Sequence, residues 1–304
     1  LRGTQSRKRL MPNINQETAD IAQALVTGLD AAGLPFHAER IRGCGHWFKQ
    51  WRCDACGERD WSMKHWCNVK LCPWCSRARV ARLYGRYGDA LQAITRPRMI
   101  TLTVRNIPEG ELRYNLRRFS KCLSRFWEKF LKAKSCGACV ATEVTYNRDT
   151  RTWHPHAHLV YDGDFIAQAE LANAWRKASE GWGYVVDIRE LRGNWARELL
   201  KYVGKSAEFA DRKNALFEFV KGTTKFRFWR TWGRFYKIPE PEEGDVHERK
   251  CPKCGTLMVL EEDNVALESI LKNWNGVFGE AGERPEYHPP PKTETEWWSN
   301  ASTN

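Results

Sequence analysis

Apolar residues recur at helical spacing in some stretches of the chain and as short β-branched runs in others, so the sequence predicts both helices and strands. Helices are predicted over residues 16–32, 76–94, 111–133, 165–180, 194–205 and 207–221. Strands are predicted over residues 99–104, 139–147, 153–162 and 183–188, with part of another within 226–238.

From residue 99 onward the predicted elements follow the order β-α-β-β-α-β-α. The first six match the ferredoxin-like, split βαβ arrangement, in which helices pack on one face of an antiparallel sheet. We therefore expect an α+β protein. The chain divides into a helical N-terminal segment (1–36), a cysteine-rich segment with a basic helix (37–97), the sheet domain (98–238) and an acidic, partly disordered tail (239–304).

The 304-residue chain has a net charge of +12, and this charge is unevenly distributed. The segment from Pro239 to Asn304 has 14 acidic and 6 basic residues, so the rest of the chain carries a net charge of +20. A segment this basic predicts a polyanionic partner, and nucleic acid is the first candidate. The alternative is a basic surface that only keeps the protein in solution. Several of the 15 tryptophans lie near the cysteines. We expect them either to stack on unpaired bases of a nucleic acid or to fill a small core beside the metal.

No apolar run approaches the about 18 residues that a membrane-spanning helix needs, and no apolar stretch follows the basic N-terminus. We therefore expect a cytoplasmic protein without a membrane partner. In a reducing compartment the 11 cysteines indicate metal binding rather than disulfides.

Two C-x-x-C pairs predict a structural zinc site. Fifteen residues separate Cys53-x-x-Cys56 from Cys72-x-x-Cys75, a spacing typical of four thiolates around one tetrahedral Zn²⁺. Further candidates in the same stretch are Cys44, His46, His65 and Cys67. They are either spare or part of a second site, and spacing does not decide which residues share an ion.

Another C-x-x-C pair, Cys251 and Cys254, is typical of half a zinc ribbon. Cys136 and Cys139 are one possible other half, and the roles of all four stay open.

Three histidines, His154, His156 and His158, alternate along one predicted strand and so project from one face. If the hairpin turns about the centre of NRDTRT, Glu143 lies opposite His156 and Ala141 opposite His158. Two imidazoles and a carboxylate suit Mg²⁺ or Mn²⁺ acting on a phosphate. A register slip of one residue would turn Glu143 to the other face.

Downstream, Glu198 and Tyr202 lie four residues apart on a predicted helix, with Lys201 and Lys205 beside the tyrosine. A phenol has a pKa of about 10, so it is almost entirely protonated and a weak nucleophile at neutral pH. Nearby lysines favour the phenolate, and a metal on the phosphate makes phosphorus more electrophilic. The alternative is a Glu–Lys helix face with one buried tyrosine.

In this order, ITLTV, WHPHAHLV and ELLKYVGK resemble the three motifs of the HUH endonucleases, and within them those of the plasmid rolling-circle replication initiators. The resemblance covers about Cys53 to Ile238. The branch with one catalytic tyrosine is the most similar, because Glu198 stands where a second tyrosine would lie one helical turn earlier.

The resemblance implies a site-specific, metal-dependent DNA nickase and strand transferase. His156 and His158, with Glu143 as third ligand, would hold the divalent ion against the scissile phosphodiester. Tyr202 would attack phosphorus, become linked to the 5′-phosphate and leave a 3′-hydroxyl primer.

The resemblance also implies that Glu198 activates water for a second cleavage and that Lys205, together with Lys201, orients the phosphate or the phenolate. The partners would be duplex and single-stranded plasmid origin DNA, a host helicase and the replication machinery. Two alternatives stay open: an HUH transposase or relaxase, and a zinc-dependent DNA-binding regulator without catalysis.

Overall fold

The computed structural model describes residues 16–183, 186–192, 195–202, 209–240, 249–251, 253–266 and 269, with the backbone alone for residues 16, 197 and 198. The chain forms two compact units: residues 1–81 with 242–304, and residues 82–241. We call them the N-terminal unit and the central unit. Their boundary lies within the helix α3 (Pro73–Gln92). In the described part of the chain no helix is both long and apolar enough to cross a membrane.

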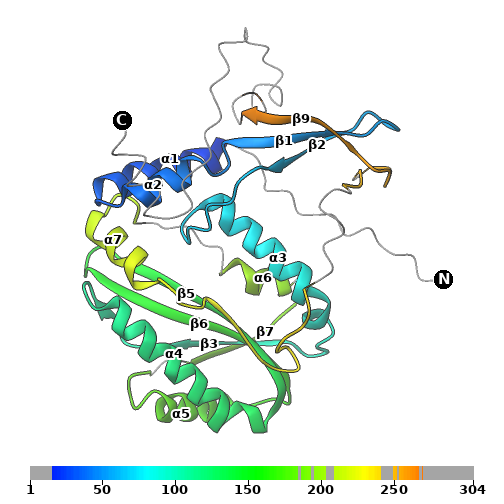
Figure 1. Ribbon diagram of the computed structural model, residues 1–304. Helices are drawn as coiled ribbons and strands as arrows, with labels where there is room; N and C mark the ends of the chain where they lie inside the picture. The colour runs from blue at the N-terminus through cyan, green and yellow to red at the C-terminus, as the bar shows by residue number, and fades with distance from the viewer. Residues whose placement is uncertain are drawn as a thin grey trace, which may run out of the picture. The chain divides into compact units, whose positions relative to one another are not determined.

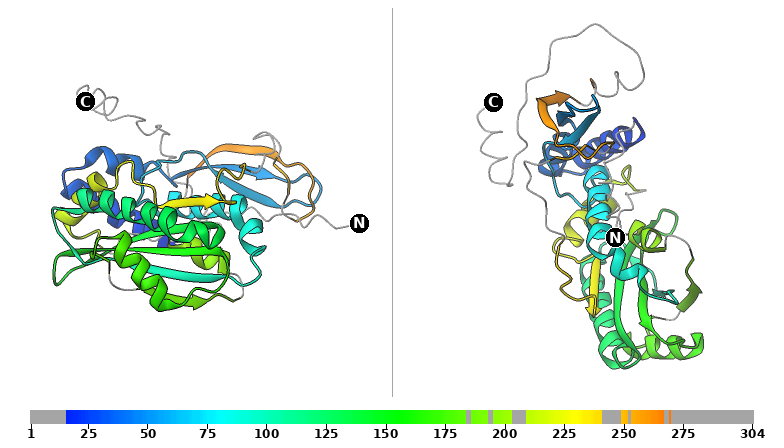
Figure 2. Two further views of the ribbon diagram at one scale, coloured as in Figure 1. Left: turned by 90° about the horizontal axis from the view of Figure 1, so that it is seen from below. Right: turned by 90° about the vertical axis from the view of Figure 1, so that its right-hand side faces the viewer.

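The N-terminal unit contains α1 (Gln16–Ala31), α2 (Pro35–Arg42) and a three-stranded antiparallel sheet in the order β2-β1-β9 (Figure 1). Its strands are β1 (Trp47–Arg52), β2 (Arg59–Met63) and β9 (Val259–Ala266), and the views of Figure 2 show them side by side. The sequence predicted α1 but neither α2 nor this sheet.

Strand β9 comes from the segment that the sequence analysis treated as an acidic tail, and it pairs with β1 from Trp47↔Ala266 to Arg52↔Val259. Ion pairs and hydrogen bonds support the pairing. Glu261 accepts hydrogen bonds from Arg59 and Gln50, and Asp263 forms ion pairs with Lys49 of β1 and with Lys64, which follows β2. Carboxylates of β9 thus pair with individual cations of β1, of β2 and of the residue that follows β2.

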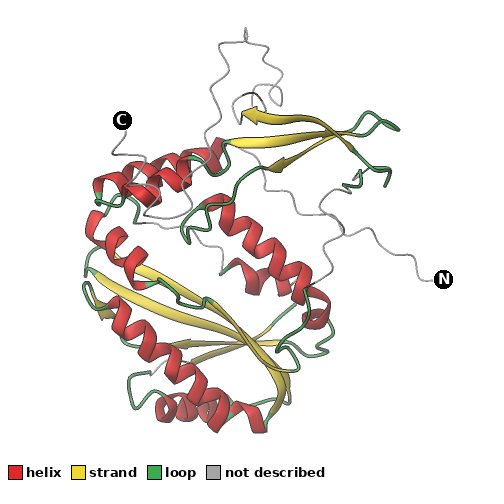
Figure 3. Cartoon of the chain, in the orientation of Figure 1, coloured by secondary structure: helices red, strands yellow, loops and turns green. Residues whose placement is uncertain are grey.

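The central unit is built on an antiparallel sheet in the order β7-β3-β6-β5-β8, with the short β4 also paired to β6. Figure 3 draws its strands in yellow and the helices in red. The strands are β3 (Arg98–Thr103), β4 (Ile107–Pro108), β5 (Ser135–Asn147), β6 (Thr152–Gly163), β7 (Val186–Glu190) and β8 (Trp229–Gly233). The helices are α4 (Leu112–Lys129), the 3₁₀ turn η1 (Leu131–Ala133), α5 (Gln168–Ala178), α6 (Trp195–Lys201) and α7 (Lys213–Gly222). The predicted α+β class is confirmed.

The predicted order of elements is present in β3, α4, β5, β6, α5 and β7, with β6 placed between β3 and β5. Helix α4 ends at Lys129 rather than at residue 133, and the two helices around Tyr202 also differ from the prediction. Helix α6 ends at Lys201, and Tyr202 lies in the following turn; Gly204 follows in the sequence, and such glycines commonly end helices. Helix α7 begins at Lys213 rather than at residue 207.

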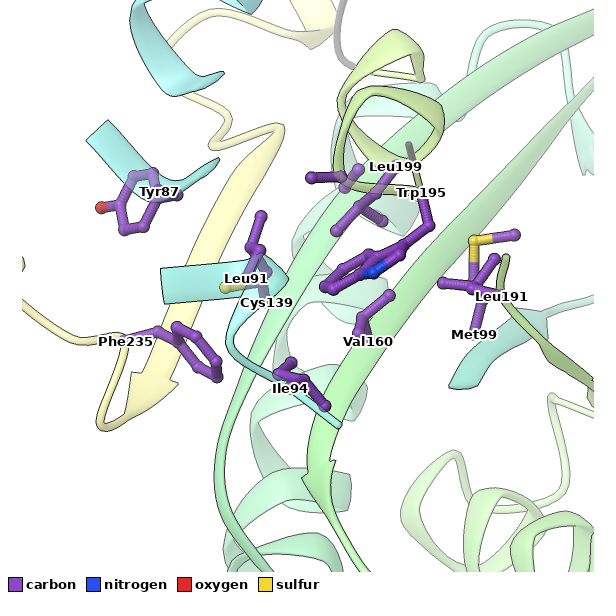
Figure 4. Packing of buried hydrophobic residues seen from close by; sticks show 12 residues of the cluster. Tyr87, Leu91, Ile94, Met99, Cys139, Val160, Leu191, Trp195, Leu199 and Phe235 are labelled. Atoms are coloured by element: carbon purple, nitrogen blue, oxygen red, sulfur yellow. The ribbon is translucent and has the colours of Figure 1, made fainter. Parts of the chain in front are cut away.

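Helices cover both faces of the central sheet, whereas the sequence predicted them on one face. On one face, Trp175 of α5 donates its indole N–H to Thr103 O, and Trp127 of α4 stacks on Trp232 of β8. On the other, α6 and the end of α3 pack against β3, β5 and β6, with Trp195 and Leu199 of α6 directed at the sheet near Val160 (Figure 4). Because the strands carry apolar side chains on both sides, both faces of the sheet must be covered to keep these side chains out of water.

Glu218 of α7 connects two elements on the α4 face. Its Oε1 accepts a hydrogen bond from the backbone N–H of Leu112 at the start of α4, over 2.7 Å. Its Oε2 accepts the indole N–H of Trp153 in β6, over 2.8 Å. One carboxylate therefore caps α4 and satisfies a buried indole.

The β5–β6 hairpin has the register predicted from its sequence. Glu143 pairs with His156 and Ala141 pairs with His158, which confirms the symmetric turn. Asn147 fixes this turn, because its Oδ1 accepts the backbone N–H groups of Asp149 and Thr150.

Candidate functional site

Three of the predicted site residues meet on the face of the central sheet that α6 covers. His158 Nε2 lies 3.1 Å from Glu143 Oε2, and both side chains are buried. The ring of Tyr202 stacks on the His158 imidazole, with centroids 3.5 Å apart and an interplanar angle of 12°. A carboxylate, an imidazole and a phenol are thus brought together from β5, β6 and the end of α6.

Thr101 completes the surroundings of His158, since its hydroxyl lies 3.4 Å from His158 Nδ1. A Thr hydroxyl that donates to Nδ1 leaves Nε2 as the N–H that donates to Glu143. Thr101 is paired with His158 across β3 and β6. Sequence reasoning missed this residue, although it lies in the ITLTV strand.

His156 and His154 continue the row along β6. The His156 ring centroid is 6.2 Å from that of His158 and 4.1 Å from that of His154. Burial lowers the pKa of His154, which favours its neutral form. In the described part of the chain, no three ligand atoms from these histidines and nearby carboxylates lie within 4.8 Å of one another.

Helix α6 positions Tyr202. Trp195, Ala196 and Leu199 are buried in the core between α6 and the sheet, so the helix is held firmly up to its last turn. Lys201 Nζ lies 5.3 Å from the centre of the Tyr202 ring. The backbone of Glu198 lies in α6, its side chain is not described, and Lys205 lies outside the described residues.

The first cysteine cluster, which we call the Cys44 cluster, lies where α2, β2 and α3 are joined and consists of Cys44, Cys67, Cys72 and Cys75. All four are buried, and neighbouring Sγ atoms are 3.5–3.6 Å apart. The backbone N–H of Asn68 points at Cys75 Sγ over 3.3 Å, which favours a thiolate. Burial raises the pKa of the Cys72 thiol, so a thiolate at this position is costly unless a cation lies beside it.

The second cluster, the Cys53 cluster, is formed by Cys53, Cys56, Cys251 and Cys254. Cys53 Sγ is 3.5 Å from Cys254 Sγ, and Cys56 Sγ is 3.5 Å from Cys251 Sγ. Each sulfur of the first C-x-x-C pair thus lies next to a sulfur of the second pair, although the two pairs are far apart in the sequence.

The Cys53 cluster is made of two knuckles with the same backbone hydrogen bonds. In the first, the N–H of Cys53 donates to Glu58 O and that of Gly57 to Cys53 O. In the second, Cys251 donates to Thr256 O and Gly255 to Cys251 O. Each C-x-x-C-G segment turns on a glycine with positive φ, 70° at Gly57 and 78° at Gly255, which an L side chain rarely adopts.

These clusters correct the predicted grouping of cysteines. Cys53 and Cys56 do not share a site with Cys72 and Cys75; each pair joins a different cluster. Of the four further candidates, Cys44 and Cys67 complete the Cys44 cluster, and His46 and His65 are in neither group. Cys136 and Cys139 join neither cluster, and Cys139 is buried in the core beneath α6. The reason is tertiary, because pairing of β9 with β1 brings Cys251 and Cys254 to the end of β1.

Of the two expectations for the tryptophans near the cysteines, filling a small core holds for part of them, and stacking on bases stays a prediction. Trp47 and Trp74 are buried, and Trp74 occupies the space where a side chain at Gly45 would lie. Trp51 and Trp61 are half-buried and donate their indole N–H groups to Ser62 and Gln50. Trp66 is exposed.

Comparison with known proteins identifies a family. A model of the replication protein family matches residues 59–279, which is more than half of the chain and includes the histidine row, Tyr202 and most of the cysteines. No solved structure matches the chain.

Curated relatives agree with the family match. The chain is 26% identical over 178 residues to a protein named Protein rep from Bacillus sp, covering 53% of this chain and 58% of that protein. Protein rep from Bacillus amyloliquefaciens is 26% identical over 53% of this chain and 52% of its own length. Protein rep from Lentilactobacillus hilgardii is 23% identical over 77% of this chain and 82% of its own. The chain therefore spans a little over half the length of the first two relatives.

Proposed function

Because this chain belongs to the replication protein family, we propose that it initiates rolling-circle replication of a plasmid by nicking one strand of the origin. The observation that carries the proposal is the stack of Tyr202 on the His158 ring, whose Nε2 meets Glu143. This contact brings the proposed nucleophile and two proposed metal ligands together at one place on the sheet. The motif order of the HUH endonucleases supports the same reading.

In the proposed reaction, the phenol oxygen of Tyr202 attacks the scissile phosphorus. The phenol gives up its proton as a new O–P bond joins the tyrosine to the 5′-phosphate, the bond from phosphorus to the 3′-oxygen breaks, and one proton is taken up by this oxygen. The free 3′-hydroxyl then serves as the primer for a polymerase. One phosphodiester replaces another, so the step is reversible and the same tyrosine link allows strands to be rejoined.

The residues around Tyr202 fit a divalent cation. Glu143 Oε2 and His158 Nε2 are 3.1 Å apart, close to the about 3 Å between neighbouring ligands of an octahedral Mg²⁺ or Mn²⁺. His156 is the third proposed ligand, from the same face of β6. When bound, such an ion neutralises phosphate charge and makes phosphorus more electrophilic.

Glu198 and the lysines complete the proposal. Glu198 is one turn before Tyr202 in the chain and would accept a proton from the water of the terminating cleavage. Lys205, together with Lys201, would favour the phenolate or orient the phosphate. Recruitment of a host helicase and polymerase stays a prediction from the family resemblance.

We further propose that each cysteine cluster holds one structural Zn²⁺. Four thiolates at about 2.3 Å from zinc lie about 3.8 Å from one another in a tetrahedron, and the sulfurs here are 3.5–3.6 Å apart. The two C-x-x-C-G knuckles of the Cys53 cluster have the same backbone hydrogen bonds, which supports two matching pairs of ligands around one ion. Zinc would tie β9 to the β1–β2 hairpin.

The test is incubation with a supercoiled plasmid that carries the origin of a replicon of this family, in the presence of Mn²⁺. We expect nicked circles and a protein band that carries covalently bound DNA. Tyr202→Phe should lose both products and still bind DNA, while the exposed Tyr236→Phe should behave as the wild type. Normal nicking by Tyr202→Phe would reject Tyr202 as the nucleophile.

A further inference from the structure

Helix α4 exposes a row of cations on the side turned away from the sheet. Between Leu112 and Trp127 the helix has five basic residues and no acidic one. Arg118 lies over the Trp182 ring and Arg125 pairs with Glu180. The remaining three, Arg113, Arg117 and Lys121, are exposed and follow one another at four-residue spacing.

This arrangement is unfavourable for the helix by itself. Residues four apart lie on one face, so the three charges repel one another along a single row. In the described part of the chain, no salt bridge is found for Arg113, Arg117 or Lys121. The nearby Glu111 is engaged at the start of the helix with Asn115. An uncompensated row of this kind indicates an anionic partner.

Two exposed aromatic rings accompany these cations. Tyr114 is 72% exposed and follows Arg113 in α4, and Phe217 on α7 is 45% exposed. Lys221 Nζ, one turn after Phe217, lies 5.9 Å from the centre of that ring. Large aromatic side chains this exposed on a well-packed unit have no role in its core.

The two helices meet where these side chains lie. Glu218 of α7 accepts the N–H of Leu112, and a Cβ at Gly222 would be 3.5 Å from the backbone nitrogen of Arg113. Figure 1 shows α7 beside the start of α4. We call the surface formed by Arg113, Tyr114, Arg117, Lys121, Phe217 and Lys221 the α4–α7 face.

We propose that the α4–α7 face binds single-stranded DNA, with the cations on the backbone phosphates and the two rings stacked on bases. Interleaved cations and exposed aromatics are the pattern that single-strand binding requires, because every base offers a ring to stack on. A duplex hides its base faces and would leave Tyr114 and Phe217 without a function.

This face is separate from the proposed cleavage site. Trp232 and Arg230 of β8, which contact Trp127 and Ser120 of α4, pair with Ala138 and Val140. Glu143 and His158 belong to the alternate residues of β5 and β6, which point to α6. The proposal rests on the proposed function in taking DNA as the ligand, but it concerns the opposite side of the sheet. A strand released by nicking would have a place to be held away from Tyr202.

The experiment measures binding of the full chain to a labelled oligo(dT) by fluorescence anisotropy over a range of salt concentrations. Arg117→Gln/Lys121→Gln should weaken binding about tenfold and lower the salt slope by about 1.4, since each cation on a single strand contributes about 0.7. Tyr114→Ala should weaken binding at least about fivefold with little change of slope. The matched control is Arg96→Gln/Lys177→Gln, which removes two exposed cations outside the face.

The outcomes separate this inference from the proposed function. The face variants should still nick a short origin oligonucleotide at saturating concentration, whereas Tyr202→Phe should bind oligo(dT) normally and fail to nick. Oligo(dT) affinity and salt slope equal to those of the control double variant would overturn the proposal. A loss seen with duplex DNA alone would also overturn it, because the face would then take a duplex.

Discussion

The Tyr202 ring lies flat on the imidazole of His158, with centroids 3.5 Å apart and planes 12° from parallel. His158 in turn meets Glu143 through Nε2, over 3.1 Å. The contact joins a residue of the β5–β6 hairpin to the end of α6, so the position of the phenol depends on how α6 packs on the sheet.

Removing the charge of the carboxylate beside His158 should strongly slow nicking without unfolding the protein. Glu143→Gln keeps an oxygen that accepts from His158 Nε2 but loses the charge that would bind a divalent cation. We expect nicking with Mn²⁺ to fall about 100-fold or more, with DNA binding retained. The control is Glu190→Gln on the exposed part of β7. Unchanged nicking by Glu143→Gln would remove this residue from the metal site.

Metal content should follow the two clusters. The purified wild type should contain two equivalents of zinc by elemental analysis, and Cys251→Ser or Cys72→Ser should each lower this to about one. Cys136→Ser serves as the control, since Cys136 is exposed and belongs to neither cluster. A wild type without zinc, or a Cys251→Ser variant with two equivalents, would contradict the assignment.

The Glu218 carboxylate should be one of the side chains on which the stability of the central unit depends. Glu218→Ala leaves the Leu112 N–H and the Trp153 indole N–H without their acceptor. We expect a loss of about 2–4 kcal/mol in the free energy of unfolding, measured by urea denaturation. Glu128→Ala, which removes a carboxylate from an exposed pair with Lys132, should change it by less than about 0.5 kcal/mol. Equal effects of the two variants would show that Glu218 does not connect α7 to α4.

Attachment of β9 should weaken in acid. The Arg59 side chain, followed by that of Gln50, lowers the pKa of Glu261 to about 2. A carboxyl group whose folded pKa is depressed stabilises the folded state above its unfolded pKa of about 4.3 and loses that contribution as pH falls towards 2. Glu261→Gln should therefore lower the melting temperature at pH 7, and the difference from the wild type should shrink by pH 3. Glu17→Gln, on an exposed residue of α1, is the control; a difference independent of pH would contradict the expected role of Glu261.

Local patterns were sufficient to predict much of the central unit. The β5–β6 register could be predicted because a hairpin depends on its own turn, and the period of two in a strand then fixes which residues share a face with His156 and His158. The helix stripe of α4 was predictable for the same reason, since i, i+3 and i+4 spacing is a property of one segment.

The sequence by itself thus determined the hairpin, the row of histidines and the two thiolates that each C-x-x-C knuckle presents, because these depend on residues close together in the chain. The tertiary structure decided which knuckles share a centre. It also decided that Thr101 meets His158 and that α6 covers the histidine face. Cys53 and Cys254 are 201 residues apart, and only pairing of β9 with β1 makes them neighbours. Spacing along a chain carries no information about such contacts, which are set by the strand pairings and the packing of helices on the sheet.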